Sequence, residues 1–231
     1  MSERTLSFSL GCKSGLPIFV GYFPTAMAFG LVVKELGLRL WEAVLFSMSN
    51  FAGSGQFLAA SLIGSNALLI EIFISVLLIN LRYTFMGAEV ARRLEPGVRG
   101  IKRILLAHGT TDEVFSIALM NPSTLPASYL AGLELTSYAG WVSGTALGFV
   151  VGLILPPALQ LAVGVTIYAM FASLLAQEFR QKGYRVLLIA GISAASHSIL
   201  TLVLSVTIGW SFVISMLLAS FIGSLLIQEE P

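Results

Sequence analysis

Long apolar runs separated by short polar stretches are the main pattern of this chain. Runs such as Val186–Val206 are continuous, without the alternation of polar and apolar residues that barrel strands show. The pattern therefore predicts an all-α integral membrane protein with about seven or eight hydrophobic helical segments, some of them broken or re-entrant. We expect these segments at Gly15–Glu35, Trp41–Ile63, Ala67–Ala88, Ile104–Met120, Pro126–Leu155, Ala158–Phe179, Val186–Val206 and Ser211–Ile227.

The stretch His108-Gly109-Thr110-Thr111-Asp112-Glu113 interrupts one of these apolar runs. Asp112 lies nine residues after Arg103, which ends a basic cluster. On one continuous helix, that spacing places Asp112 roughly 13 Å deeper, near the middle of the hydrocarbon core. Ionisable groups at such depth are costly and mark functional sites by default. In the alternative interpretation, Ile104–Met120 is too short and polar to span, and lies at the interface or in a loop.

Helix-breaking residues occur in two earlier segments. Pro24 removes a backbone donor, so it is expected to kink or interrupt Gly15–Glu35. The second segment contains Asn50-Phe51-Ala52-Gly53-Ser54-Gly55-Gln56, in which glycines permit unwinding and polar side chains supply donors and acceptors. This combination resembles the broken helices of transporters. Close helix packing through small residues is the alternative explanation.

Small residues also recur at helical spacing elsewhere. A ridge with a period of four residues, predicted to serve helix packing, contains Gly132, Thr136, Gly140, Gly144, Gly148 and Gly152. A weaker ridge contains Ser211, Ser215, Ala219 and Gly223. His197 lies in mid-segment and is expected to be a hydrogen-bonded packing residue rather than a proton carrier.

The basic loops set the expected orientation. Loops 92–103 and 180–185 should be cytoplasmic in a multi-pass protein of the cell membrane. Arg4 and Lys13 place the N-terminus on the same side. Three full crossings before the first basic loop, and three more between the two loops, would contradict this orientation, unless one segment in each trio fails to cross. The candidates are the second segment, broken at Gly53–Gly55, and the fifth, which is expected either to start as a surface helix or to break near Thr136–Gly140.

These two candidates also look alike. Ser49–Gly53 matches Thr136–Gly140 at a shift of 87 residues, and Thr25 aligns with Thr111 at a shift of 86. We therefore expect one transmembrane domain, residues 1–231, with an internal repeat (11–97 and 98–184) followed by a helical pair (186–227). Under that hypothesis, Pro24-Thr25 and Thr111-Asp112 flank one central site.

Composition narrows the possible functions. Of 231 residues, 56% are hydrophobic and 11% charged, whereas about a quarter is charged in soluble proteins. The net charge of +1 argues against a nucleic-acid partner. Cys12 is the single cysteine, which excludes an intrachain disulfide and a cysteine metal site. Because catalytic and cofactor motifs are missing from the sequence, we expect neither an enzyme nor a cofactor or metal site.

The polar residues instead suit the passage of a small solute. Broken helix ends offer amides to a carboxylate and carbonyls to an ammonium. In this hypothesis Asp112 titrates or pairs with a substrate ammonium, with Glu113 close by, and Thr111 orients it. The predicted transport path comprises Pro24, Asn50, Gly53, Ser54, Gly55, Gln56, Asn80, Thr111, Asp112 and Glu113.

Four motifs together resemble one family. They are LPIFVGYFPTAMAFG (Leu16–Gly30), NFAGSGQF (Asn50–Phe57), NLRYTFMGAEVARR (Asn80–Arg93) and TDEVF (Thr111–Phe115). The chain is similar to the AzlC/BrnF family, the large subunits of branched-chain amino acid exporters. The resemblance implies export of small neutral amino acids such as valine, leucine, isoleucine and methionine, with a small membrane subunit of the AzlD/BrnE type. Some relatives carry an acidic residue where Asn80 stands, so a mechanism needing a carboxylate there is in doubt.

Proton antiport is the expected driving reaction. Two rival classes remain: a channel or passive pore for a small solute, and a non-transporting membrane subunit that folds or regulates a partner. Saturable, exchange-accelerated efflux would exclude the pore.

Overall fold

The computed structural model is helical and describes residues 6–120, 124–152 and 183–226, with positions 154, 156, 172, 175–176 and 179–180. Its described helices are α1 (Phe8–Glu35), α2 (Leu40–Ser49), α3 (Gly53–Gly64), α4 (Leu69–Arg93), α5 (Gly100–His108), α6 (Asp112–Leu119), α7 (Ala127–Gly152), α9 (Tyr184–Ser198), the π-helical turn η1 (Ile199–Val203) and α10 (Ile208–Leu226). Over these residues there is no strand, only an isolated bridge between Leu94 and Leu125. The all-α prediction is confirmed.

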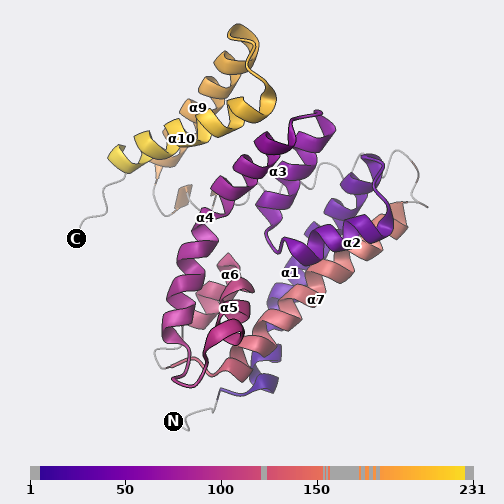
Figure 1. Ribbon diagram of the computed structural model, residues 1–231, viewed down its shortest axis with the longest axis vertical. Coiled ribbons are helices and arrows are strands. Elements are labelled where there is room, and N and C mark those ends of the chain that lie inside the picture. The colour runs from indigo at the N-terminus through magenta and orange to yellow at the C-terminus, as the bar shows by residue number, and fades with distance from the viewer. Residues whose placement is uncertain are drawn as a thin grey trace. The chain divides into compact units, whose positions relative to one another are not determined.

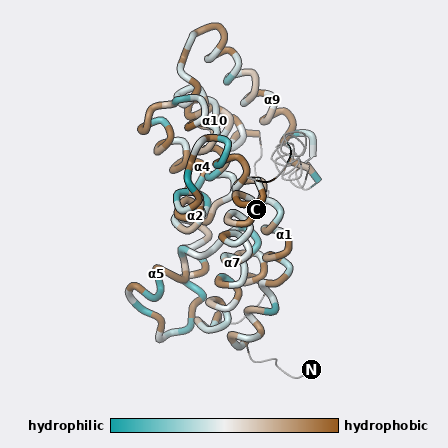
Figure 2. The backbone as a smooth tube through the Cα atoms, turned by 90° about the vertical axis from the view of Figure 1, so that its right-hand side faces the viewer, coloured by the Kyte–Doolittle hydropathy of each residue, from teal (hydrophilic) through white to brown (hydrophobic). Residues whose placement is uncertain are grey.

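Several helices have the length and composition of membrane spans. Within the described residues these are Phe8–Glu35, Leu69–Arg93, Tyr184–Val203 and Ile208–Leu226. Hydrophobic positions dominate α9 and α10 (Figure 2). The predicted segment Ala158–Phe179 lies almost entirely outside the described residues, so its structure stays a prediction.

The chain divides into two compact units. The described residues within Met1–Gln56 and Ile79–Gly164 form the first, and those within Phe57–Leu78 and Val165–Pro231 form the second. The division falls inside α3 and α4. Each unit is treated by itself below.

In the first unit, α1 and α7 lie side by side along their length (Figure 1). The glycine ridge of α7 makes this possible. A methyl group on Gly148 would lie 2.1 Å from the Met27 carbonyl oxygen, and one on Gly132 would lie 2.3 Å from that of Phe8. Only a residue without Cβ allows backbones so close together. The packing role predicted for this ridge is confirmed.

A buried hydrophobic cluster attaches the shorter helices of this unit to that pair. It includes Ile18 of α1, Val90 of α4, Leu106 of α5, Val114 of α6 and Leu130 of α7. Apolar positions at helical spacing on α5 and α6 thus face the α1–α7 pair. This packing holds the ends of α5 and α6 in place.

Two expected helix interruptions are absent from the structure. α1 continues through Pro24, whose side chain is exposed, and α7 continues through Thr136–Gly140. Both helices stay uninterrupted because α1 and α7 pack closely along their length, and a break in either helix would move its backbone away from the other. The hydroxyls of Thr136 and Ser137 bond to the carbonyls of Gly132 and Leu133, at 2.9 and 2.8 Å. The predicted likeness between 49–53 and 136–140 therefore does not extend to local structure.

The breaks occur at different positions from those predicted. The second segment breaks at Asn50–Ala52, and Gly53 and Gly55 belong to the first turn of α3. The fourth segment is not one helix, because α5 ends at His108 and α6 starts at Asp112. The depth calculated for Asp112 on a continuous helix is therefore wrong. Asp112 instead begins a new helix.

The second unit contains the pair α9 and α10 (Figure 1). The segment predicted to begin at Ser211 begins earlier, because Ile208 already belongs to α10. His197 Nδ1 lies 2.7 Å from Ser211 Oγ, the hydrogen bond expected of a packing residue. Glu71 is only 1% exposed, and its carboxylate accepts hydrogen bonds from the Leu68 amide at 2.9 Å and from the Thr207 hydroxyl. Its side chain therefore caps the start of α4.

Candidate functional site

The first unit brings two helix breaks together. One is Asn50–Ala52, between α2 and α3, and the other is Gly109–Thr111, between α5 and α6. Thr111 caps α6, and its hydroxyl accepts from the Val114 amide at 3.4 Å. Phe51 of the first break and Gly109 of the second line the same cavity. Interrupted helices at one cavity are the arrangement that transporters use to present backbone dipoles to a solute.

An ion pair lies beside these breaks. Arg82 of α4 is 3.1 Å from the Asp112 carboxylate, and it also donates to Ser54 Oγ of α3 and to the Tyr83 hydroxyl, both at 3.2 Å. The Tyr83 hydroxyl donates to Asp112 at 3.3 Å. Both charged side chains are nearly half exposed, so the pair links three helices without being deeply desolvated.

Two amides meet across the first break. Asn80 Nδ2 of α4 donates to Asn50 Oδ1 at 3.4 Å. Gly55 leaves the space for Asn80, because a Cβ there would lie 2.8 Å from its amide nitrogen. Within the described part of the chain, Asn80 Oδ1 is buried without a hydrogen-bond partner. An unpaired buried acceptor of this kind marks a candidate position for an ordered water or for a donor group of a solute.

Tyr22 of α1 contacts the second break. Its hydroxyl is hydrogen-bonded to Thr111 Oγ1 at 2.8 Å and to the Glu113 carboxylate. A phenol carries one proton, so it donates to one of these oxygens at a time. The Tyr22 ring also packs edge-on against Phe51 of the first break, at 5.8 Å between ring centroids. Tyr22 therefore connects both breaks to α1.

Gln56, one of the residues predicted to line the transport path, belongs to a buried hydrogen-bond network. Its side chain is fully buried, accepts from Trp141 Nε1 at 2.7 Å and donates to Ser47 Oγ at 3.2 Å. Ser47 in turn bonds to Thr145 at 2.8 Å. This closed network fixes the start of α3 to α2 and α7, as expected of satisfied buried polar groups.

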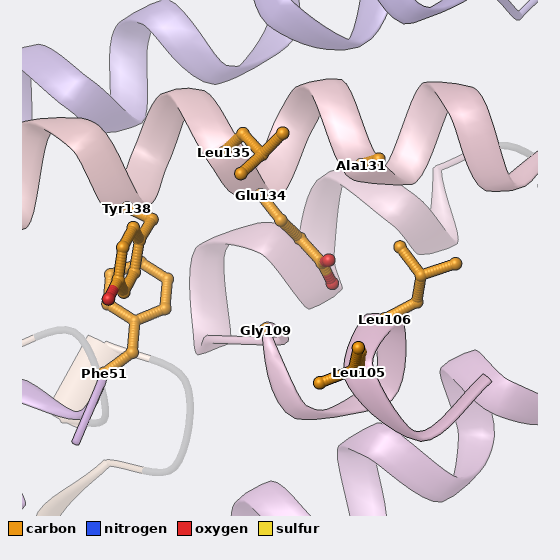
Figure 3. Close-up of a pocket in the computed structure, with 8 residues that line it drawn as sticks. All are labelled: Phe51, Leu105, Leu106, Gly109, Ala131, Glu134, Leu135 and Tyr138. Atoms are coloured by element: carbon orange, nitrogen blue, oxygen red, sulfur yellow. The ribbon is translucent and has the colours of Figure 1, made fainter. Parts of the chain in front are cut away.

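The cavity has a volume of about 370 Å³ and mostly apolar walls. One carboxylate, that of Glu134 on α7, lies among them and points toward Gly109 (Figure 3). Glu134 is 7% exposed, and its Oε1 has no hydrogen-bond partner among the residues that the structure describes. The remaining lining residues are Phe51, Leu105, Leu106, Gly109, Ala131, Leu135 and Tyr138. A volume within the usual ~300–1,000 Å³ of small-molecule sites, with one convergent carboxyl group, is typical of a binding site.

The predicted path residues are thus only partly brought together. Asn50 and Asn80 are hydrogen-bonded to each other. Ser54 and Asp112 both contact Arg82. Thr111 and Glu113 are both hydrogen-bonded to Tyr22. Pro24 is exposed on α1, and Gly53 lies against the Trp141 ring. The grouping of these residues as a transport path stays a prediction.

Sequence reasoning missed Tyr22 and Glu134. Glu134 is an isolated acid in the apolar run Tyr129–Gly140, and an ionisable group in such a run is a site signal in its own right. The glycine ridge on the same helix drew attention to packing instead. Tyr22 left no comparable signal, because a tyrosine in an apolar helix is ordinary.

Comparison with known proteins supplies the family. Residues 17–155 match the family model described as AzlC protein. The inner membrane protein YgaZ of Escherichia coli is 32% identical over 183 residues, which cover 76% of this chain and 75% of that protein. An uncharacterized membrane protein of Archaeoglobus fulgidus is 35% identical over 202 residues, covering 87% and 89%.

One relative carries a functional name. The branched-chain amino acid transport protein AzlC of Bacillus subtilis is 30% identical over 143 residues, covering 59% of this chain and 54% of that protein. No solved structure matches the chain. The names point to a membrane transporter rather than an enzyme. Because the family model matches more than half of its length, the chain belongs to the AzlC family of membrane proteins.

Proposed function

We propose that this chain is a secondary transporter that exports branched-chain and similar small neutral amino acids by proton antiport. The substrates are valine, leucine, isoleucine and methionine. The transporter works in the cell membrane, with loops 92–103 and 180–185 on the cytoplasmic side and a small AzlD/BrnE-type membrane subunit as partner.

One observation carries this proposal: two helix breaks meet at an apolar cavity that holds a single buried carboxylate. A zwitterion needs a partner for each charge. Glu134 suits an ammonium, and the first amides of α3, which begins after the first break and has no acidic residue in its first turn, suit a carboxylate. Leu105, Leu106 and Leu135 suit an aliphatic side chain, which favours neutral branched substrates over charged or large polar ones.

The polar residues at the two breaks would then form the path on which the substrate enters and leaves. Asn50, Ser54 and Asn80 contribute donors and acceptors at the first break, and Thr111 and Glu113 do so at the second. The Arg82–Asp112 pair connects α4 to the second break. Opening of this ion pair is a suitable gating step, because an exposed pair costs little to separate.

Efflux from cells tests the proposal. Cells that lack leucine export are loaded with a leucine-containing dipeptide, and leucine release is followed with the chain alone and with its gene neighbour. We expect saturable release that accelerates when external leucine or an inward proton gradient is supplied. Repeats with dipeptides of valine, isoleucine and methionine complete the assay, and failure of both combinations to release any of the four amino acids would contradict the proposal.

The same assay separates a carrier from a pore. A pore would give flux that rises linearly with internal leucine and does not respond to external leucine. Exchange acceleration requires a site that is reoriented while occupied, so its presence excludes a passive channel.

A further inference from the structure

Glu134 has no ionic partner among the described residues. It is only 7% exposed, and no salt bridge or hydrogen bond to it occurs in that part of the chain. An isolated ionised carboxylate in apolar surroundings is strongly unfavourable, so it takes up a proton or a cation. Asp112, by contrast, already has Arg82 at 3.1 Å. The predicted proton-carrying role therefore fits Glu134 better than Asp112.

Few other charges face Glu134. The cavity walls come from α5, α7 and the two breaks, and Tyr138 is their one other titratable residue. Its hydroxyl donates to the Met48 carbonyl at 3.0 Å. On the packed neighbours, His108 of α5 is exposed, while Asp112 and Glu113 of α6 are engaged by Arg82 and Tyr22. The neighbouring groups therefore leave the carboxylate to be neutralised by a ligand.

The missing side chain of Gly109 leaves the space that the Glu134 carboxylate occupies. A Cβ on Gly109 would lie 2.7 Å from Glu134 Cδ and 2.8 Å from Oε2. Gly109 has φ −72°, so its lack of a side chain is not required by the backbone conformation. Gly109 instead allows the Glu134 carboxylate to lie against the backbone of the second break.

We propose that Glu134 is the exchange site of this transporter, which holds either a proton or the ammonium group of an aliphatic amino acid. This inference rests on the proposed export function. The aliphatic side chain then contacts the leucines and Phe51 of the cavity wall. Proton and substrate exclude each other because one carboxylate serves both.

The step balances as follows. On the loading side, the O–H bond of the Glu134 carboxylic acid breaks and its proton passes to water, while the carboxylate accepts a hydrogen bond from the substrate ammonium. On the release side, the ammonium leaves and a proton from water re-forms the O–H bond. Each cycle moves one zwitterion out and one proton in, so it carries one positive charge inward and responds to membrane potential.

Proton release on binding tests this directly. Leucine is added to the detergent-solubilised full chain, with its gene neighbour where the chain needs it, in weakly buffered solution. We expect one proton released per leucine bound at a pH where the carboxyl is protonated. As the pH falls further, each unit weakens leucine binding tenfold, because protons compete for the same oxygen.

Variants assign the effect to Glu134. Glu134→Gln keeps the shape but not the charge, and we expect at least tenfold weaker binding without proton release or pH dependence. Glu134→Asp should retain both with lower affinity, which shows that a folded cavity persists. Glu35→Gln, which changes an exposed glutamate of α1, is the matched control and should behave as the unmodified chain.

Two results would overturn the inference while leaving export intact. One is proton release by Glu134→Gln equal to that of the unmodified chain. The other is leucine binding by the unmodified chain without proton release at any pH. If the unmodified chain neither binds nor exports an aliphatic amino acid, the proposed function fails, and the inference fails with it.

Discussion

The carboxylate of Glu134 lies against Gly109, with the position of a missing Cβ only 2.7 Å from Glu134 Cδ. This contact joins a buried acid on α7 to the backbone of the break between α5 and α6 (Figure 3). The break and the acid are therefore parts of one cavity. Changes at either residue should affect the other.

Gly109→Ala should lower leucine export at least tenfold, because its methyl group displaces the Glu134 carboxylate. We expect the overpacking to cost about 1–3 kcal/mol of unfolding free energy. Initial efflux rates and denaturant unfolding in detergent measure the two effects. Gly97→Ala is the control, since a Cβ there meets nothing within 4 Å. Normal export by Gly109→Ala would contradict this account of the cavity.

The α1–α7 interface should be sensitive to a single methyl group. In Gly148→Ala the new Cβ would lie 2.1 Å from the Met27 carbonyl oxygen, so the helices must separate. We expect a loss of about 1–3 kcal/mol in unfolding free energy. Gly191→Ala in α9 has open space and should be neutral or stabilising by up to about 1 kcal/mol. Equal melting temperatures for the two variants would contradict the close approach of α1 and α7 at Gly148.

The buried network of Gln56 and Trp141 should behave as one unit. Trp141→Phe leaves Gln56 Oε1 unpaired in the core, and Gln56→Leu leaves Trp141 Nε1 unpaired, so each should cost about 1–3 kcal/mol. The double variant should cost less than the sum of both. A double-mutant cycle of unfolding free energies measures this coupling, and additive losses would refute it.

The Arg82–Asp112 pair should matter more for transport than for stability. Because both side chains are nearly half exposed, Asp112→Asn should change unfolding free energy by no more than about 1 kcal/mol. Its export rate should fall, since Arg82 loses its carboxylate partner, and Arg82→Gln added to Asp112→Asn should restore part of it. The pH dependence of leucine binding should persist in Asp112→Asn. Loss of that dependence would transfer the exchange role from Glu134 to Asp112.

Local sequence chemistry predicted the helical class and the existence of broken segments. Continuous apolar runs identify membrane helices, because backbone groups in lipid must bond within the segment. The ridge of glycines on α7 also predicts its packing role, because a four-residue period places small residues on one helix face, where another helix can approach closely. In these cases the signal and its cause lie within one segment.

Features that depend on tertiary contacts were not predicted. Pro24 does not break α1, because packing against α7 supports the helix on both sides of it. The break near Gly53 lies three residues earlier than expected, and the run containing Asp112 is two helices. The ion pair between Arg82 and Asp112 joins residues 30 positions apart, and no local pattern specifies such a pairing.

Protection of a single cysteine tests most directly whether the cavity binds aliphatic amino acids. Ala131 lines the cavity, so Ala131→Cys in a Cys12→Ser chain places a thiol beside the site. We predict that leucine slows labelling of this thiol saturably, that lysine does not, and that neither affects Ala88→Cys on exposed α4. Labelling of Ala131→Cys at the same rate with and without saturating leucine would contradict the account.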